Sequence, residues 1–412
     1  MDKSYHGKNY GMELFERSIA LTTHHDAITG TSKELVTKNY MKRLLQGWDA
    51  AEIILTNTLA ILTKKEENKI NKNKTLNVFP TQKLCRQLNE SYCPESMGTD
   101  SFTVTILNGN SKQFSGYIRI PVNNQNIKIL SNNGQQTDFR LIPLFISQSQ
   151  KINQSKYELI FKANVGPIGF TTFFYIRLNF NENGRIESLE DLTRENAKFK
   201  FTQEFLCYEG EFKSKEIITR YSMPEINSSG IFWTDSNGRR NIQRKRNFNK
   251  YFNLGENIKY PSSANYYPIT SRIGLSDNLN QMSILTDRSQ GGTSLNDGQI
   301  EIMGEDENGL IIRAKHWLHF GPKTEEPSSN RILGLQLFHE PTLLFSKFSG
   351  EFNDYNNKYL TNFSALNFDL PPNINLLTFK HIGNKQILIR LEHIFQTGED
   401  ANLSNPIYLN LQ

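Results

Sequence analysis

The spacing of apolar residues changes once along this chain of 412 residues, and the change limits the folds that it can adopt. Within the first 64 residues, apolar side chains such as Phe15, Ile19 and Leu44 recur at the period of an amphipathic helix. After residue 80 they alternate with polar residues, which is typical of a strand with one buried face. The chain is therefore predicted to begin with helices and to continue as β structure.

Two helices are expected within residues 1–64. The first covers residues 11–23, and the second runs from residue 31 to about residue 61. Thr31 and Glu34 have the T-x-x-E spacing of a capping box, which predicts that the second helix starts there.

The rest of the chain is predicted to be a linker followed by antiparallel sheets. Residues 65–80 are polar and charged without a periodic apolar face, so we expect a linker. Short alternating or apolar runs follow, among them SFTVTIL, GYIRIPV, YELIFKANV, TTFFYIRLNF, EIITRYSM, MSILTD, QIEIM, GLIIRAKHWLHF, NLLTF, QILIRLEHIF and PIYLNL. They predict a first β domain over 81–180 and a C-terminal β-sandwich region over 181–412. The expected fold class is mainly β, with a short N-terminal helical segment and stacked antiparallel β-sandwich domains.

The composition excludes several classes of protein. With 37% hydrophobic and 22% charged residues, the chain is globular rather than disordered. Its net charge of +5 is small for this length, so nucleic acid is not an expected partner. No apolar run reaches the ~18 residues of a membrane-spanning helix, so no membrane association is expected. The residues after Met1 lack the apolar core of a signal peptide, so no leader is expected there.

The triplet His24-His25-Asp26 falls in the corner between the two predicted helices. Imidazole nitrogens and carboxylate oxygens are zinc ligands, and one zinc ion needs three or four protein ligands. Because neighbours in sequence usually cannot all reach one ion, we expect at most one of the two histidines to bind. The alternative is a polar corner, in which a histidine caps a helix C-terminus and Asp26 holds the turn.

Three further stretches contain residues that could bind a ligand. The pattern argues against a metal site in the first, and each of the other two has two interpretations. His316 and His319 stand in a strand pattern, where residues i and i+3 point to opposite faces, so a shared metal is not expected. Residues 238–250 are rich in Arg and Lys, which fits a targeting or phosphate-binding run or a solvated basic strand end. Residues 286–303 are predicted to form a strand, a glycine loop and a second strand. There, Gly291–Gly292 fit either a plain hairpin or a close approach to a ligand.

The cysteines and glycosylation sequons leave the compartment open. Cys85 and Cys93 could close a small disulfide loop, with Cys207 alone, or all three could be reduced thiols. Sequons begin at Asn73, Asn89, Asn153, Asn227, Asn362 and Asn402. Because the chain contains 45 asparagines, about six sequons are expected by chance, so their number does not indicate secretion.

Several segments together resemble one enzyme family. The segment HHDAITGTS is similar to a signature of the zinc-dependent α-mannosidases of glycoside hydrolase family 38. Further segments resemble the lysosomal branch of that family and occur in the family's order: LCRQLNESYCP, FWTDSNGR, ANYYPITSRI, TDRSQGGTSLNDGQIEIM, LPPNINLLTF and RLEHIFQTGED. The resemblance extends from about residue 10 to the C-terminal residue.

The resemblance implies roles for individual residues. His25 corresponds to a zinc ligand, and Asp26 corresponds to a residue that contacts mannose in the same pocket. Arg288 lies in a segment that approaches the sugar in the family, and Cys85 and Cys93 correspond to a disulfide pair. It also implies a galactose-mutarotase-like supersandwich fold for the β region, a helical-bundle origin for residues 1–64, and a lysosomal or vacuolar location.

The implied chemistry is hydrolysis of terminal α-mannosyl residues, with mannose-containing glycans as partners. Such enzymes retain configuration by using two carboxylates, one as nucleophile and one as acid and base. In the family, Zn²⁺ holds the 2- and 3-hydroxyls of the sugar. The family's catalytic aspartates and the other zinc ligands belong to a barrel domain that has no counterpart among these motifs.

We therefore expect no catalytic residue in this chain, a single zinc ligand, His25, and no activity of the chain alone. The alternatives are a non-catalytic carbohydrate- or partner-binding β module, or a subunit that completes an enzyme together with a separate barrel-containing chain.

Overall fold

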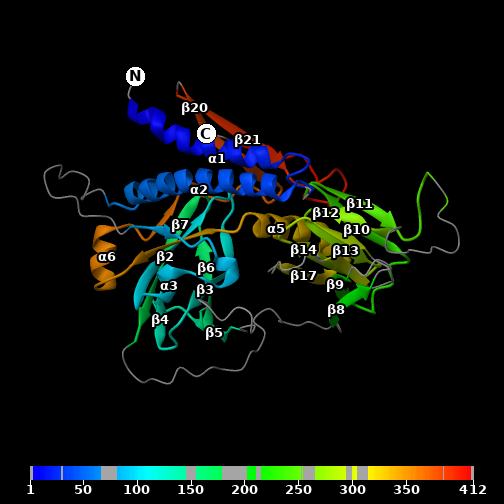
Figure 1. Ribbon diagram of the computed structural model, residues 1–412, viewed down its shortest axis with the longest axis horizontal. Helices are drawn as coiled ribbons and strands as arrows, with labels where there is room; N and C mark the ends of the chain where they lie inside the picture. Colours follow the sequence, from blue (N-terminus) through cyan, green and yellow to red (C-terminus); the bar gives the residue numbers. More distant parts are fainter. Residues whose placement is uncertain are drawn as a thin grey trace. The chain divides into compact units, whose positions relative to one another are not determined.

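In the computed structural model, the chain folds into two compact units (Figure 1). Unit 1 comprises residues 1–109, 113–187 and 341–367, and unit 2 comprises residues 110–112, 188–340 and 368–412. The structure describes residues 3–28, 31–65, 81–144, 155–178, 202–209, 215–251, 253, 265–293, 299–303, 314–383 and 385–409. The predicted linker therefore lies, from residue 66 onward, outside the described residues.

The mainly β fold class predicted from the sequence is confirmed. The described strands assemble into sheets of six, five, five, three and two strands, and every strand pair among them is antiparallel. Two long helices precede them, as the change of apolar period predicts.

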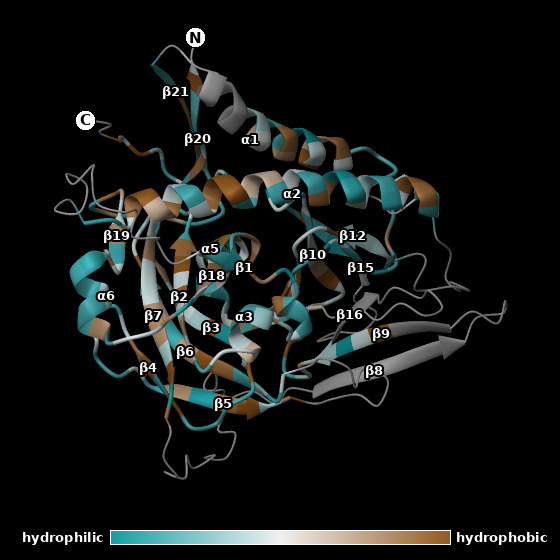
Figure 2. Ribbon diagram, turned by 60° about the vertical axis from the view of Figure 1, so that its left-hand side comes forward, coloured by the Kyte–Doolittle hydropathy of each residue, from teal (hydrophilic) through white to brown (hydrophobic). Residues whose placement is uncertain are grey.

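The two N-terminal helices are α1 (Lys3–Thr22) and α2 (Glu34–Leu62). Polar and apolar stretches alternate along α2 in Figure 2, as expected of an amphipathic helix. The predicted capping box is wrong, because Lys33 is the N-cap residue of α2 and makes no side-chain cap hydrogen bond. Thr31 lies outside the helix, and its hydroxyl donates a hydrogen bond to Asp26 instead.

Unit 1 contains a β-sandwich. Its larger sheet has the order β1-β18-β2-β7-β19, with β4 also paired to β7, and its smaller sheet has the order β3-β6-β5. The strands are β1 (Lys83–Leu84), β2 (Ser101–Asn108), β3 (Phe114–Val122), β4 (Ile127–Leu130), β5 (Phe139–Pro143), β6 (Tyr157–Val165), β7 (Gly169–Arg177), β18 (Thr342–Lys347) and β19 (Asn362–Ser364). Three short helices accompany them: a 3-10 helix (Leu88–Glu90), α3 (Pro94–Met97) and α6 (Phe352–Lys358).

Side chains of both sheets fill the core of this sandwich. Phe102 of β2 stacks on Tyr175 of β7, with ring centroids 4.3 Å apart, and Phe161 of β6 contacts Phe173. Fully burying one such side chain stabilises the fold by about 1.5–3 kcal/mol. The alternation seen in the sequence therefore directs every second residue of these strands into one apolar layer.

The outer face of the larger sheet is covered by α2. Leu59 is 2% exposed and packs with Phe170 of β7 and Leu344 of β18. Because β2 and β7 are covered on both faces, nearly all of their residues are buried, including the hydrogen-bonded pair Thr105 and Thr172. This packing fixes the C-terminal half of α2 on unit 1.

Unit 2 contains a second sandwich of two five-stranded sheets. Their orders are β11-β10-β13-β14-β17 and β12-β15-β16-β9-β8. The strands are β8 (Thr202–Glu209), β9 (Lys215–Ser222), β10 (Ile231–Ser236), β11 (Arg240–Lys245), β12 (Tyr267–Ile269), β13 (Arg272–Ser276), β14 (Asn280–Thr286), β15 (Gln290–Thr293), β16 (Gln299–Met303) and β17 (His316–Pro322). Tyr221, Phe232, Ile273 and Met282 lie in its apolar core.

A helix interrupts the β region of unit 2. A 3-10 turn (Lys323–Glu325) leads into α5 (Glu326–Phe338), which packs beside β14 and β17. The expectation of an uninterrupted β region is therefore wrong here. The segment EPSSNRILGLQLF begins with Pro near the first helical position, which favours a helix start.

Helix α5 is held to unit 2 by a buried ion pair. The side chains of Arg331 and Glu399 are 4% and 10% exposed, and they form a two-pronged contact with N–O distances of 3.0 and 2.9 Å. Arg331 also donates to the carbonyl oxygens of Gly238 and Arg239 in the turn between β10 and β11. One guanidinium thus joins a helix, a β-turn and the segment near the C-terminal end of the described chain.

A second buried carboxylate organises the same turn. Oδ1 of Asp235 accepts hydrogen bonds from the backbone N–H groups of Thr270, Ser271 and Arg272 at 2.8–3.0 Å. Its Oδ2 accepts one from the N–H of Gly238 at 2.7 Å. Asp235 is 3% exposed, so these bonds replace the water that the carboxylate loses on burial.

Unit 2 ends in a hairpin of β20 (Ile374–Gly383) and β21 (Gln386–His393), which pair only with each other among the described strands. The strand predicted for PIYLNL is wrong over residues 406–409, which have no regular structure, and residues 410–412 lie outside the described part.

Candidate metal and sugar site

The corner between α1 and α2 is built by local hydrogen bonds. The N–H of His24 donates to Leu21 O as α1 ends, and the N–H groups of Ala27 and Ile28 donate to His24 O. Asp26 O accepts from the N–H of Ser32, which brings the chain back toward α2. These bonds wind residues 24–28 into a tight turn.

This turn directs the three polar side chains of the corner toward one another. Oδ2 of Asp26 lies 3.5 Å from Nε2 of His24 and 3.7 Å from Nε2 of His25. The two imidazole rings are 4.2 Å apart between centroids. The sequence predicts that at most one of the two histidines binds an ion, and this stays a prediction. The turn brings both imidazoles to the same carboxylate oxygen.

The donor set and its spacing fit a zinc ion. Ligand atoms of His24, His25 and Asp26 all lie within 4.8 Å of one another. Zinc takes imidazole nitrogen and carboxylate oxygen at about 2.0–2.2 Å, so two ligands of one tetrahedral ion are roughly 3.4 Å apart. Within the described ranges, this triplet is the one group of three or more His, Cys, Asp or Glu side chains close enough to share an ion.

The corner is open to solvent. The side chain of His25 is 81% exposed, and those of His24 and Asp26 are 41% and 47% exposed. Thr31 Oγ1 donates a 2.9 Å hydrogen bond to Oδ1 of Asp26, which orients the carboxylate and leaves Oδ2 facing the histidines. Hydrogen bonds of this kind, from outside the ligand set, hold the ligands of metal sites in place.

Arg288 belongs to the other unit. It stands in the turn between β14 and β15, where its Nε lies 3.2 Å from Oδ1 of Asp287 and its carbonyl oxygen accepts from Thr286. His25 and Asp26 are residues of unit 1, and Arg288 is a residue of unit 2. Its predicted role at a sugar stays a prediction.

A polar cluster near Arg288 was not predicted from the sequence. Tyr221 Oη is 2.5 Å from Nδ1 of His316, and Nε2 of His316 is 3.1 Å from Oε1 of Gln290. Burial raises the pKa of Tyr221 to about 12 and lowers the pKa of His316. Both side chains are therefore neutral near pH 7, and the cluster serves as a hydrogen-bond network between the two sheets of unit 2.

His319 has different partners from His316, as the strand pattern predicts. Its Nδ1 lies 2.9 Å from Nε2 of Gln281. Burial lowers the pKa of His319 as it does that of His316.

The glycine loop predicted between two strands is wrong at Gly291 and Gly292, because both lie within β15 and pair with residues of β12. Gly291 closely approaches a tyrosine of this chain. A Cβ atom on Gly291 would lie 1.8 Å from Oη of Tyr266, so no larger residue fits there without a shift. The close approach expected of Gly291 therefore has an internal explanation. The segment connects two different sheets, because β14 pairs with β13 and β17, whereas β15 pairs with β12 and β16.

The basic run forms a strand at a sheet edge. Six of its thirteen residues lie in β11, where Arg244 packs its guanidinium over the ring of Tyr267 at 4.1 Å and donates to Thr234. Arg239 pairs with Glu392. The solvated strand end is thus the interpretation that the structure favours for these residues.

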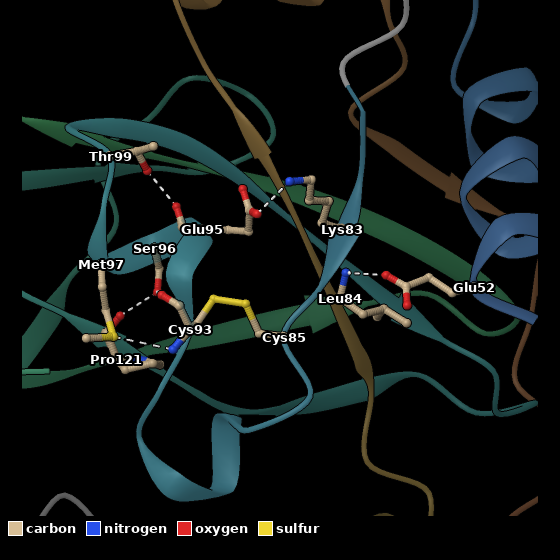
Figure 3. Close-up of a disulfide and its surroundings, with 10 residues drawn as sticks. All are labelled: Glu52, Lys83, Leu84, Cys85, Cys93, Glu95, Ser96, Met97, Thr99 and Pro121. Atoms are coloured by element: carbon tan, nitrogen blue, oxygen red, sulfur yellow. Dashed lines mark hydrogen bonds and ion pairs between the residues drawn. A yellow bond between two sulfur atoms is a disulfide. The ribbon is translucent and has the colours of Figure 1, made fainter. Parts of the chain in front are cut away.

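Cys85 and Cys93 form a disulfide with their Cα atoms 5.2 Å apart (Figure 3). The bond closes a loop beside α3, where Ser96 Oγ donates to Pro121 O at 2.6 Å and Lys83 Nζ lies 2.9 Å from Glu95. Of Cys207, in β8, only the backbone is described.

The loop is also tied to the helical pair. Arg86 lies 2.6 Å from Asp49 and 2.7 Å from Glu52, and the N–H of Leu84 donates to Glu52. The two carboxylates raise the pKa of Arg86. The disulfide loop and the C-terminal half of α2 therefore form one packed region of unit 1.

Comparison with known proteins connects this architecture to one family. Residues 211–303 match the model of the glycosyl hydrolases family 38 C-terminal domain. The chain resembles the C-terminal part of the lysosomal-type α-mannosidases of glycoside hydrolase family 38. Lysosomal α-mannosidase of Bos taurus is 26% identical over 96% of this chain and 49% of its own length, and that of Homo sapiens is 25% identical over 96% and 50%.

Two further matches are also named as α-mannosidases. An α-mannosidase of Arabidopsis thaliana is 24% identical over 95% of the chain and 52% of its own length. An α-mannosidase structure from Enterococcus faecalis V583 aligns with a TM-score of 0.49 at 11% identity, covering 93% of this chain and 58% of that one. The chain spans about half the length of the curated relatives that it matches. None of the described helices combines the length and apolarity needed to cross a membrane.

Proposed function

We propose that this chain is the part of a family 38 α-mannosidase that supplies His25 as a zinc ligand and Asp26 as a mannose contact. The proposed activity is hydrolysis of terminal α-mannosyl residues of glycans in a lysosome or vacuole. The observation that carries the proposal is the convergence of the HHD side chains at an exposed corner, in a chain whose relatives are α-mannosidases. Neither nucleic acid nor a membrane is proposed as a partner.

The residues of the corner have separate tasks in this proposal. His25, the most exposed of the three, presents Nε2 to the ion. Asp26 presents Oδ2 to the sugar, while Thr31 donates a hydrogen bond to its other oxygen, Oδ1. A bound zinc ion would polarise and orient sugar hydroxyl groups. Arg288 is proposed as a weaker contact to the sugar.

Turnover by the chain alone is not expected. A retaining glycosidase needs two carboxyl groups about 5 Å apart on either side of the scissile bond. The corner supplies one carboxylate, Asp26, and its Oδ1 is already engaged by Thr31. A nucleophile and an acid would have to come from elsewhere.

The test is an aryl α-mannoside assay on the purified chain with added Zn²⁺. No release of aryl alcohol above the zinc-only background is expected. Zinc-dependent turnover that disappears in His25→Ala would contradict this. His381→Ala, which removes an exposed histidine on β20, is the matched control for non-specific metal binding.

A second candidate is a subunit that docks with a separately encoded barrel chain. Exposed apolar side chains one turn apart on α2 favour it: Met41 is 57% exposed, and Leu45 is 49% exposed. Singly exposed apolar residues are common, but a row of them along one helix is typical of a contact surface. A non-catalytic mannose-binding module is the remaining alternative.

Pull-down from the source cells separates these candidates. Recovery of a barrel-containing chain that is lost in Met41→Asp with Leu45→Asp would support the subunit. Saturable binding of α-mannosides by the isolated chain, without turnover and without such a partner, would support the binding module.

A further inference from the structure

The basic run of residues 238–250 divides into two parts. Arg239 and Arg244 are used within unit 2, since Arg239 pairs with a glutamate of β21 and Arg244 lies over a tyrosine ring of β12. Lys245, at the end of β11, and Lys250, in the turn that follows, are exposed. Neither lysine forms an ion pair with a described carboxylate, so both ammonium groups are open to a ligand.

Two aromatic side chains are exposed in the same turn. Phe248 is 54% exposed and Tyr251 is 87% exposed. Nζ of Lys245 lies 5.7 Å from the ring centroid of Phe248, and Nζ of Lys250 lies 5.9 Å from that of Tyr251. Both distances are close to the limit of a cation–π contact, about 6 Å, so the rings are only weakly engaged. Residues 245–251, the aromatic turn, thus present two ring–ammonium pairs of similar spacing to solvent.

Hydrogen bonds hold the aromatic turn in one conformation. Asn265 is fully buried, and its Oδ1 accepts from the N–H of Asn247 at 2.6 Å while its Nδ2 donates to Oδ1 of Asn247 at 2.8 Å. The N–H of Arg246 donates to the carbonyl oxygen of the residue before β10, and that of Tyr251 donates to Oδ1 of Asn249. A ligand of the two rings therefore does not have to order the turn, which lowers the entropic cost of binding.

The aromatic turn lies in a segment of one charge sign. Residues 236–255 contain six basic residues and no acidic one. A carboxylate, Asp277, lies at the same end of the sheet, in the turn between β13 and β14, because β10 joins β11 to β13. Its Oδ1 accepts hydrogen bonds from the N–H groups of Leu279 and Asn280, which hold it in its own turn. The aromatic turn therefore has an excess of positive charge, which attracts an anionic partner.

The partner must combine negative charge with a flat apolar face. A sugar ring stacks its C–H face on an aromatic ring, and a phosphate ester on that sugar gives a neighbouring ammonium group an anion to bind. A lipid surface fits less well, because no aliphatic side chain occurs among residues 245–251 and interfacial segments bind through a large apolar face. The relatives of the chain are named as α-mannosidases, which makes mannose the sugar to consider first.

We propose that the aromatic turn binds a phosphorylated mannan. Phe248 and Tyr251 stack on sugar rings, and Lys245 and Lys250 contact phosphate esters. The identity of the sugar rests on the function proposed above, but binding at this turn requires neither zinc nor turnover.

Binding of the full chain to an immobilised mannan that carries phosphate monoesters tests this surface. A chelator is present throughout, and the ionic strength is about 0.15 M. Saturable binding is expected, and phosphatase treatment of the mannan should weaken it by about tenfold, a difference of roughly 1.4 kcal/mol. Equal binding before and after phosphatase treatment would overturn the proposal.

Two double variants separate the contributions of charge and stacking. Lys245→Ala with Lys250→Ala and Phe248→Ala with Tyr251→Ala should each weaken binding by about tenfold. All four side chains are exposed, so the denaturant midpoint of each variant should equal that of the unsubstituted chain. Unchanged binding in the aromatic variant would mean that the lysines act only as surface charge, and it would overturn the proposed stacking.

The matched controls lie elsewhere on unit 2. Lys380→Ala with Lys385→Ala removes the same charge from exposed positions of the β20–β21 hairpin. Phe368→Ala with Phe379→Ala removes two rings that are 64% and 63% exposed. Both controls should bind mannan as the unsubstituted chain does. A loss in the lysine control as large as that in Lys245→Ala with Lys250→Ala would overturn the assignment to the aromatic turn.

Vesicles of anionic lipid and single-stranded DNA are the competing probes. If either binds as tightly as the phosphorylated mannan, and is lost in the same variants, the turn belongs to that partner and the proposal is overturned. His25→Ala should leave mannan binding unchanged, because the corner between α1 and α2 is not involved. Absence of mannan binding would therefore overturn this inference without affecting the tests of zinc and mannoside turnover.

Discussion

The two sandwiches of this protein are secured by different chemistry. Unit 1 has an aromatic core between sheets of six and three strands, and a disulfide closes the loop that leads into it. Unit 2 has a core between two five-stranded sheets, but its turns are organised by the buried carboxylates of Asp235 and Glu399. Redox conditions should therefore control the stability of unit 1, and charge and protonation should control that of unit 2.

The tryptophans allow the units to be observed separately. Trp48 lies in α2 of unit 1, whereas Trp233 and Trp317 lie in β10 and β17 of unit 2. Single-tryptophan variants would report the free energy of unfolding of each unit in a denaturant titration. Each experiment compares the unfolding midpoint that Trp48 reports for unit 1 with the midpoint that Trp233 or Trp317 reports for unit 2.

The largest effect is expected from Arg331→Met. The substitution leaves Glu399 buried without its ion pair, and removing one partner of a buried pair costs about 3–5 kcal/mol. The unfolding midpoint reported by Trp233 should fall, whereas that reported by Trp48 should not change. The double variant Arg331→Met with Glu399→Gln should recover part of the loss, because the uncompensated charge is removed. Equal loss in both units would mean that they unfold as one body.

Replacing both Cys85 and Cys93 by Ser should act on the other unit. The sequence separation of the bridged residues is 8, for which the chain-entropy model gives about 2.5 kcal/mol. In a denaturant titration, we expect the unfolding midpoint reported by Trp48 to fall and the midpoint reported by Trp317 not to change. Adding reductant to the unsubstituted protein should reproduce the shift. A fall in the stability of unit 2 on adding reductant would contradict the proposal that redox conditions act on unit 1 alone.

Acid should weaken unit 2 selectively. Burial lowers the pKa values of His316, His319 and His339 from 6.5, and all three belong to unit 2. The unfolded chain then binds protons near pH 6.5 that the folded unit does not. Stability of unit 2 should therefore be full above pH 6.5 and fall as the pH drops toward the lowered pKa values.

The measurement is the midpoint of Trp317 between pH 8 and pH 5, roughly the range in which histidine titrates. His319→Gln should reduce the slope, because one of the buried histidines no longer titrates. His381→Gln, on the exposed strand β20, is the control and should leave the slope unchanged. A steeper acid response of Trp48 than of Trp317 would contradict the comparison.

The smallest effect is expected from Lys38→Ala. Lys38 pairs with Glu34 on α2, but the two side chains are 66% and 80% exposed. Exposed pairs of this spacing contribute about 0.3–0.5 kcal/mol, and salt screens them. The free energy of unfolding reported by Trp48 should fall by no more than this amount. In high salt, the substitution should leave it unchanged. A larger loss would mean that unit 1 also depends on charge.

Local patterns predicted the elements of this fold better than their connections. Alternation in SFTVTIL and apolar spacing around Phe15 identified β2 and α1, because burial of one face leaves a direct periodic signal. The pattern missed α5, whose apolar residues do not follow the helical period closely. It could not reveal that Asp235 and Arg331 are buried, since a single charged residue has no periodicity.

In the candidate site, too, the sequence identified single residues better than the contacts between them. The family-like motif singled out His25 and Asp26, but only the turn after α1 shows that both imidazoles approach one carboxylate oxygen. The cluster of Tyr221 and His316 joins residues far apart in sequence, so no local signal could have indicated it.

Strand β18 has a consequence for synthesis of the protein on the ribosome. It lies between β1 and β2 in the larger sheet of unit 1, where Phe345 pairs with Val104, yet it is translated after residues 188–340 of unit 2. Until it emerges, β2 has an open edge that can pair with other chains. The open edge of β2 must therefore stay unpaired with other chains while residues 188–340 are synthesised. A premature stop between residues 188 and 340 would leave unit 1 permanently unfinished, although most of its sequence had already been translated.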